Sequence, residues 1–153
     1  KVDYVSESNK KKMIFYWHRL NPWDDAKEAI ISLNKKFLSS SLSNGNIYLQ
    51  KNLIKYAGLE LNFLVSAESV KLYKPNINVY LSAAESIGFH PNNCALVASH
   101  RNDLKAASKA GFFTTFIKRR TEYGKFSYKF PKTNFIPNLS VGKLTEIKKK
   151  LST

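Results

Sequence analysis

Short apolar segments alternate with longer, helix-like segments along most of the chain, and this alternation is the strongest constraint on its fold. Four apolar segments have the length and composition of buried strands: 37–42, 62–66, 94–98 and 113–117. Five segments show the apolar periodicity of helices: 24–36, 47–57, 77–86, 103–110 and about 141–151. Strands that are joined through helices pair in parallel through right-handed crossovers. The sequence therefore predicts an α/β protein built around a parallel sheet.

Length and composition suit one domain, or part of one, with a core of its own. The chain has 153 residues, of which 43% are hydrophobic, and this content excludes the disordered class. No apolar run reaches the roughly 18 residues that a membrane-spanning helix needs, so no membrane partner is expected. Cys94 is the single cysteine, which excludes a disulfide scaffold and fits a reducing compartment. We therefore expect a cytoplasmic protein.

The chain is strongly basic, with 25 Lys and Arg residues against 11 Asp and Glu residues and a formal net charge of +14. Such a balance is compatible with nucleic-acid binding. The basic tracts are short, however, at 10–12, 118–120 and 148–150, and aromatic residues do not interleave with them as in RNA-recognition motifs. We interpret the charge as a solvated basic surface, so nucleic acid is not the expected partner. A binding protein that uses this charge is the non-enzymatic alternative.

Polar residues follow three of the predicted strands and mark the expected position of a site. In parallel α/β sheets, ligands bind beyond the carboxyl ends of the strands. Ser43 and Asn44 follow the first strand, 68–74 follow the second, and 99–103 follow the third. These three loops are therefore the candidate site.

Four sequence motifs in and around these loops occur in a family-like order. They are WHRLNPW at 17–23, LSNGN at 42–46, LYKP at 72–75 with Tyr80 six residues after Lys74, and VASHRNDL at 97–104. Together they resemble the haloacid dehalogenase superfamily, and its type II 2-haloacid dehalogenase branch in particular. The resemblance extends from about residue 16 to 124. It implies a Rossmann-like core with a helical cap inserted after the first strand, so that 1–19 would be the remnant of the cap and 20–153 a partial core.

The resemblance also implies a two-step reaction and assigns residues to it. An aspartate carboxylate displaces halide from the substrate and forms an ester, which water then hydrolyses. Lys74 would keep that carboxylate ionised and offset negative charge as halide departs, and Asp103 would pair with Lys74 and orient it. Ser43 and Asn44 would hold the substrate carboxylate or the nucleophile. Tyr80 would lie close to the bound substrate.

Each of these residues also has a purely structural interpretation. Ser43 and Asn44 fit a strand-to-helix turn with a capping Asn. Lys74 stands before a proline at a helix start, and Asp103 lies where a carboxylate stabilises the first turn of a helix. Tyr80 fits a buried aromatic residue on a helix face. The position of these residues relative to the strands is what favours a role in the site.

The fourth motif departs from the family pattern, because His100 stands in place of the Asn of many dehalogenases and Ala98 in place of their Ser. An imidazole beside an ester intermediate could activate water, so His100 is the third catalytic candidate, with Lys74 and Asp103. The alternative is a hydrogen-bonded loop histidine. His18, at the start of the resemblance, is expected to be structural.

No nucleophile is identified in this sequence. The family places it on a first strand that ends in an Asp motif followed by Gly-Thr, and neither Asp3 nor the pair Asp24-Asp25 has that context. The first strand would lie between the strands at 37–42 and 94–98. The sequence is therefore expected to represent the carboxyl-terminal part of such an enzyme, inactive and of low stability on its own.

Neither a metal nor another cofactor is expected. Phosphatases of the superfamily hold Mg²⁺ with carboxylates and usually carry two acids close together in the fourth motif. That motif here offers Asp103 with Arg101 and His100 beside it, a poor set of oxygen ligands. A small-molecule phosphatase is the alternative enzyme. The expected partner is a 2-haloacid or related short carboxylate, and the resemblance suggests a homodimer.

Overall fold

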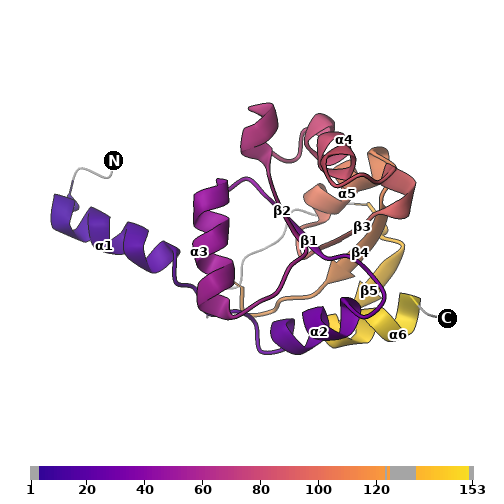
Figure 1. Ribbon diagram of the computed structural model, residues 1–153, viewed down its shortest axis with the longest axis horizontal. Coiled ribbons are helices and arrows are strands. Elements are labelled where there is room, and N and C mark those ends of the chain that lie inside the picture. Colours follow the sequence, from indigo (N-terminus) through magenta and orange to yellow (C-terminus); the bar gives the residue numbers. More distant parts are fainter. Residues whose placement is uncertain (1–3, 123, 125–133, 152–153) are drawn as a thin grey trace.

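The computed structural model describes residues 4–122, 124 and 134–151. Strands lie in the middle of the molecule and helices surround them, as Figure 1 shows. The helices are α1 (Glu7–Trp17), α2 (Ala26–Leu33), α3 (Ile47–Ala57), α4 (Ile77–Ser86), α5 (Arg101–Lys109) and α6 (Ile147–Leu151). The strands are β1 (Ser40–Ser43), β2 (Phe63–Ser66), β3 (Ala95–Ala98), β4 (Phe113–Ile117) and β5 (Leu139–Val141). Short 3-10 turns occupy Ala67–Val70, Pro91–Asn93 and Leu144–Glu146. The α/β class predicted from the sequence is confirmed.

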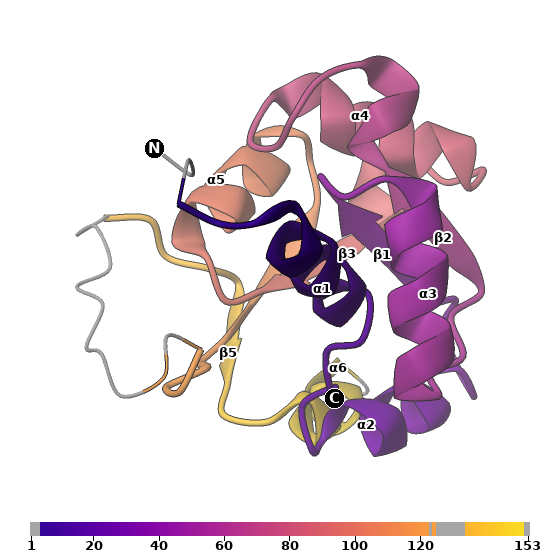
Figure 2. The same cartoon turned by 90° about the vertical axis from the view of Figure 1, so that its left-hand side faces the viewer.

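Among the described residues all strand pairs are parallel, and they form two sheets rather than one. β1 pairs with β2 so that Ser43 lies opposite Ser66, and β3, β4 and β5 form the second sheet with Ala98 opposite Phe116. β1 and β3 are the neighbouring strands of the two sheets (Figures 1 and 2). Within the described residues, each of these two strands pairs on one edge only. The gap between the two sheets, between β1 and β3, lies where the sequence analysis expects the first strand of the family.

Local sequence signals explain where the central helices begin and end. The Asn46 side chain accepts a hydrogen bond from the Leu49 amide (2.8 Å) at the start of α3, and Gly58 ends that helix with a φ of +60°. Asn76 caps α4 through the amide of Asn78 (3.0 Å). The predicted bounds of α3, α4 and β4 are confirmed.

Several other boundaries differ from the prediction by one to three residues, and the helix predicted over 24–36 spans only Ala26–Leu33. The first strand begins at Ser40 rather than 37, because the amide of Phe37 still donates to the carbonyl of Leu33 (2.9 Å) and continues the turn that follows α2. α5 begins at Arg101 rather than 103. Both shifts leave the loops after the strands at the positions that the sequence predicts.

The largest error concerns the carboxyl-terminal region. The sequence predicts a helix from about 141, whereas residues 139–141 form β5 and α6 begins only at Ile147. Val141 lies opposite Ile117 of β4, and both side chains are buried with Ile147 in one apolar cluster. Burial against β4 therefore holds this short segment as a strand. Part of the predicted turn region before it, 123 and 125–133, lies outside the described residues.

The larger core cluster lies under α4 and α5 and supports the candidate site. Tyr80 is its largest fully buried member, and the Tyr80 and Phe112 rings meet edge to face with centroids 6.3 Å apart. Small residues such as Ala84 and Ala107 let the two helices approach each other and the sheet. The position of Tyr80 is therefore fixed by packing on the apolar side of α4.

Helix α1 lies apart from both core clusters. None of its residues is buried, and Met13–Trp17 are each more than half exposed. Figure 2 shows α1 in front of the sheets, beside α3. The assignment of 1–19 to a cap remnant stays a prediction. Among the described helices, none has the length and apolar character to cross a membrane.

Candidate active site

The Asp103 carboxylate is the centre of the candidate site, and two predicted residues bond to it. Lys74 Nζ lies 2.8 Å from Asp103 Oδ2, and the Tyr80 hydroxyl donates a hydrogen bond to Asp103 Oδ1. The Lys74 and Asp103 side chains are 18% and 15% exposed, and Tyr80 is fully buried. An ion pair with so little exposure is weakly screened by solvent, so each charge depends strongly on the other.

The loops after β1, β2 and β3 hold this group together. Asn44, which follows β1, accepts a hydrogen bond from the Lys74 amide (2.7 Å) and donates its side-chain amide to the Lys74 carbonyl (3.3 Å). Asp103 lies in the first turn of α5, where the helix dipole favours a carboxylate. Asp103 can therefore bond to Lys74 and stabilise the start of α5 at the same time, so its two interpretations do not exclude each other. Asn44 fixes the backbone that presents Lys74.

The phenol of Tyr80 acts as a neutral donor in this site. Burial, the hydrogen bond to Asp103 and the negative charge of Asp103 all raise the Tyr80 pKa above its ordinary value of 10.0. The hydroxyl therefore keeps its proton at physiological pH. Asp103 thus receives one bond from a cation and one from a neutral hydroxyl, which uses both of its oxygens.

Ser43 bonds within its own turn rather than to the Lys74–Asp103 pair. Its Oγ accepts a hydrogen bond from the Gly45 amide (2.9 Å), and the Gly45 carbonyl accepts from Ser66 Oγ and Gln50 Nε2 (both 2.9 Å). Gln50 also donates to the Val65 carbonyl (3.2 Å) and is 5% exposed. Sequence analysis did not identify Gln50, whose only signal is a polar residue on an otherwise apolar helix face.

His100 is held by an acid that sequence analysis did not identify. His100 Nε2 lies 2.9 Å from Glu122 Oε1, and Ser99 Oγ donates to Glu122 Oε2 (3.0 Å). Glu122 follows β4, outside the motifs, and no sequence spacing marks it. Half of the His100 side chain is exposed, so the ring is accessible to water.

Comparison with known proteins gives the family. A family profile described as haloacid dehalogenase-like hydrolase matches residues 2–111. The chain is 32% identical to (S)-2-haloacid dehalogenase 4A of Burkholderia cepacia over 114 residues, which cover 72% of this chain and 49% of the relative. It is 27% identical to (S)-2-haloacid dehalogenase 1 of Pseudomonas sp. (strain CBS-3) over 122 residues, 78% of this chain and 54% of the relative. The chain thus spans about half the length of these curated relatives.

Solved structures agree with the sequence matches. A crystal structure of an L-2-haloacid dehalogenase superposes with a TM-score of 0.90 at 32% identity, covering 97% of this chain and 64% of that one. That of a defluorinating L-2-haloacid dehalogenase gives 0.89 at 27% identity, covering 100% and 62%. The resemblance seen in the sequence motifs and the predicted Rossmann-like core are confirmed. The chain belongs to the haloacid dehalogenase-like hydrolase family.

Proposed function

We propose that this chain is part of a hydrolase that cleaves the carbon–halogen bond of a 2-haloacid through an aspartyl-ester intermediate. The observation that carries the proposal is the Lys74–Asp103–Tyr80 group, which the segments after β2 and β3 bring together. In this proposal the nucleophilic aspartate lies on a strand between β1 and β3, contributed by residues outside this sequence. The names of the relatives, which are dehalogenases of 2-haloacids, support the substrate class.

The proposed chemistry gives each described residue one task. The nucleophile's carboxylate oxygen bonds to the carbon that bears the halogen while the carbon–halogen bond breaks, and halide leaves with the electron pair. Lys74 keeps that carboxylate ionised and stabilises the departing negative charge. Asp103 and Tyr80 hold Lys74. Water then hydrolyses the ester and restores the carboxylate, releasing the 2-hydroxy acid.

The turn after β1 would bind the substrate carboxylate. Ser43 and Asn44 precede the start of α3, where the helix dipole favours an anion. The Ser43 side chain bonds within the turn and the Asn44 side chain bonds to the backbone of Lys74, so both support a rigid turn. In the proposal, backbone and side-chain groups of this turn together contact the substrate. Tyr80 would not contact the substrate itself but would hold Asp103 in place through its hydrogen bond.

A chimera tests the proposal. In it, the part of the Burkholderia cepacia relative that precedes the matched region is joined in front of the full chain. We expect the chimera to release chloride from (S)-2-chloropropionate, and the 153-residue chain alone to release none, because the nucleophile is supplied only in the chimera. A folded chimera without halide release would contradict the proposal.

The Mg²⁺-dependent phosphatase is the less favoured alternative. Both oxygens of Asp103 are engaged by Lys74 and Tyr80, which leaves that carboxylate poorly placed to bind a hard cation. Among the described residues, no cluster of three or more potential metal ligands occurs. Phosphate-ester hydrolysis that is lost with EDTA would favour this alternative. Steeply salt-dependent binding of nucleic acid would favour the non-enzymatic one.

His100 has a proposed task in the second step. Its imidazole would take a proton from the water that attacks the ester, and Glu122 would orient the ring. We expect Glu122→Gln in the chimera to slow ester hydrolysis about tenfold and His100→Ala to slow it about a hundredfold. Single-turnover measurements that separate halide release from hydroxy-acid release check this. An unchanged second step in His100→Ala would leave His100 as a loop residue.

We also propose a cellular compartment and a subunit assembly for the protein. The free thiol of Cys94 suits a reducing cytoplasm. The exposed Met13, Tyr16 and Trp17 side chains of α1 offer a surface that the rest of the enzyme or a second subunit would cover. Sedimentation of the chimera measures whether it is the expected homodimer.

A further inference from the structure

A pocket of about 660 Å³ lies between α1 and α3, and no residue of the candidate active site lines it. Its volume is in the range of small-molecule sites. The lining residues are Lys11, Ile14, Phe15, His18, Arg19, Tyr48, Asn52, Lys55 and Tyr56. The catalytic proposal does not use any of them.

The pocket is lined by cations and by no acid. Lys11 of α1, Arg19 of the turn that follows α1, and Lys55 of α3 contribute positive charge. Within the described part of the chain, none of the three forms an ion pair. Several cations around one pocket, without acids among its lining residues, raise the local concentration of anions. The charge of the pocket therefore selects for a negatively charged ligand.

Several lining side chains are already held in place. The Arg19 guanidinium lies 3.6 Å from the centroid of the Phe15 ring and donates to the Phe15 carbonyl (3.4 Å). Asn52 Nδ2 lies 2.9 Å from His18 Nδ1, and the His18 and Tyr48 ring centroids are 5.4 Å apart. If Asn52 donates to Nδ1, the neutral His18 ring carries its hydrogen on Nε2 and can donate it to an anion. His18 thus contacts Asn52 of α3 and also lines the pocket.

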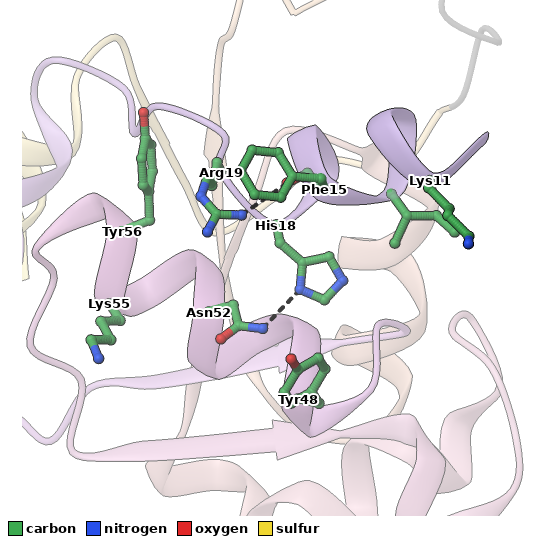
Figure 3. Close-up of a pocket in the computed structure, with 9 residues that line it drawn as sticks. Lys11, Phe15, His18, Arg19, Tyr48, Asn52, Lys55 and Tyr56 are labelled. Carbon is green, nitrogen blue, oxygen red and sulfur yellow. Dashed lines mark hydrogen bonds between the residues drawn. The ribbon is translucent and has the colours of Figure 1, made fainter. Parts of the chain in front are cut away.

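The arrangement of charges and rings indicates the shape of the ligand. Figure 3 shows Lys55 and Lys11 at opposite ends, with the rings of Phe15, His18 and Tyr48 between them. Aromatic rings bind flat apolar groups, and Arg and Lys bind carboxylates or phosphates. A second copy of the chain is not favoured as the occupant of this pocket, because the lining cations would repel a partner with a net charge of +14.

We propose that this pocket binds a flat organic anion, an aromatic ring that carries one or two carboxylate or phosphate groups. The ring lies between the aromatic side chains, and the anionic groups contact Arg19, Lys55 and Lys11. The proposal does not depend on the catalytic one, since it uses none of the same residues.

Calorimetric titration of the 153-residue chain tests this with naphthalene-2,6-dicarboxylate, its neutral dicarboxamide and adenosine monophosphate. We expect at least one of the two anions to bind, and naphthalene-2,6-dicarboxylate to bind about tenfold more tightly than its dicarboxamide. Affinity should fall as salt is raised, because the pocket is open to solvent. Which anion binds more tightly distinguishes carboxylate from phosphate ligands. Binding of neither anion, or equal binding of dicarboxylate and dicarboxamide, would overturn the proposal.

Two lysines on the same helix provide the matched comparison. Lys55→Ala should weaken binding about tenfold, whereas Lys51→Ala, an exposed lysine of α3 outside the pocket, should leave it unchanged. Amide chemical shifts should change along α1 and α3. Equal losses in both variants, or shift changes elsewhere, would mean that the anion is attracted by net charge and not by this pocket. Analytical ultracentrifugation excludes self-association as the source of the signal.

Discussion

Replacing Lys74 by Met is expected to lower halide release by the chimera about a thousandfold. The methionine fills similar space but removes the cation that the proposal places beside the nucleophile. Loss of one charge-stabilising group in a water-poor site commonly costs two to three orders of magnitude, roughly 10²–10³. We expect the loss in kcat rather than in KM, because the charge matters most as halide departs. Steady-state chloride release from (S)-2-chloropropionate measures it.

The Lys74 variant also leaves Asp103 without its cationic partner, so a folding defect must be separated from a chemical one. Lys105→Met is the matched control, because Lys105 is an exposed lysine of α5 close to Asp103 in sequence. Unfolding midpoints of both variants show whether the fold is retained. A Lys74→Met variant that retains its fold and most of its kcat would remove Lys74 from the proposed mechanism.

Tyr80 and Asn44 show how far the sequence predicts the site. The strand-to-loop positions bring Lys74, Asp103 and Tyr80 together, as sequence motifs and the rule for parallel sheets suggest. The sequence does not reveal that Asn44 bonds to both backbone groups of Lys74, because a side chain that bridges two loops leaves no local pattern. Ser43 was expected near the substrate, and its observed bond lies within its own turn.

Two of the unpredicted features depend on contacts between distant segments. β5 is a strand because it pairs with β4; its three residues, Leu-Ser-Val, alternate between apolar and polar but are too few for this pattern to identify a strand. Glu122 reaches His100 and Ser99 from the turn after β4. α3 and α4, by contrast, have caps and glycine stops within their own sequence, which is why their bounds could be predicted.

Asp25 holds together three parts of the chain that are distant in sequence, and its loss is expected to cost about 3 kcal/mol. Arg119 donates from Nη2 to Asp25 Oδ1 (2.8 Å) and from Nη1 to Oδ2 (3.2 Å). The amide of Leu144 also donates to Oδ2 (2.7 Å). The two charged side chains are only 11% and 13% exposed, so Asp25→Asn leaves a largely buried guanidinium without its counter-charge.

The same contacts determine how this contribution depends on pH. Burial alone would raise the Asp25 pKa, but the hydrogen bonds from Arg119 and Leu144 and the charge of Arg119 outweigh it and lower the pKa below its ordinary value of 3.8. A carboxyl whose pKa is lower in the folded state stabilises the fold above its unfolded pKa. That stabilisation is lost as the pH falls through the folded value.

Urea unfolding of the 153-residue chain at pH 7 and at several pH values between 4 and 2 measures both effects. At pH 7, Asp25→Asn should lower the free energy of unfolding by about 3 kcal/mol, and the neighbouring exposed Asp24→Asn by less than about 0.5 kcal/mol. Between pH 4 and pH 2 the original chain should lose stability more steeply than Asp25→Asn, because the variant has no carboxyl to protonate at this position. Equal losses of unfolding free energy in the two variants at pH 7 would show that the Asp25–Arg119 ion pair stabilises the fold no more than the exposed Asp24 does. Parallel pH profiles for the original chain and Asp25→Asn would show that the Asp25 pKa is not lowered on folding.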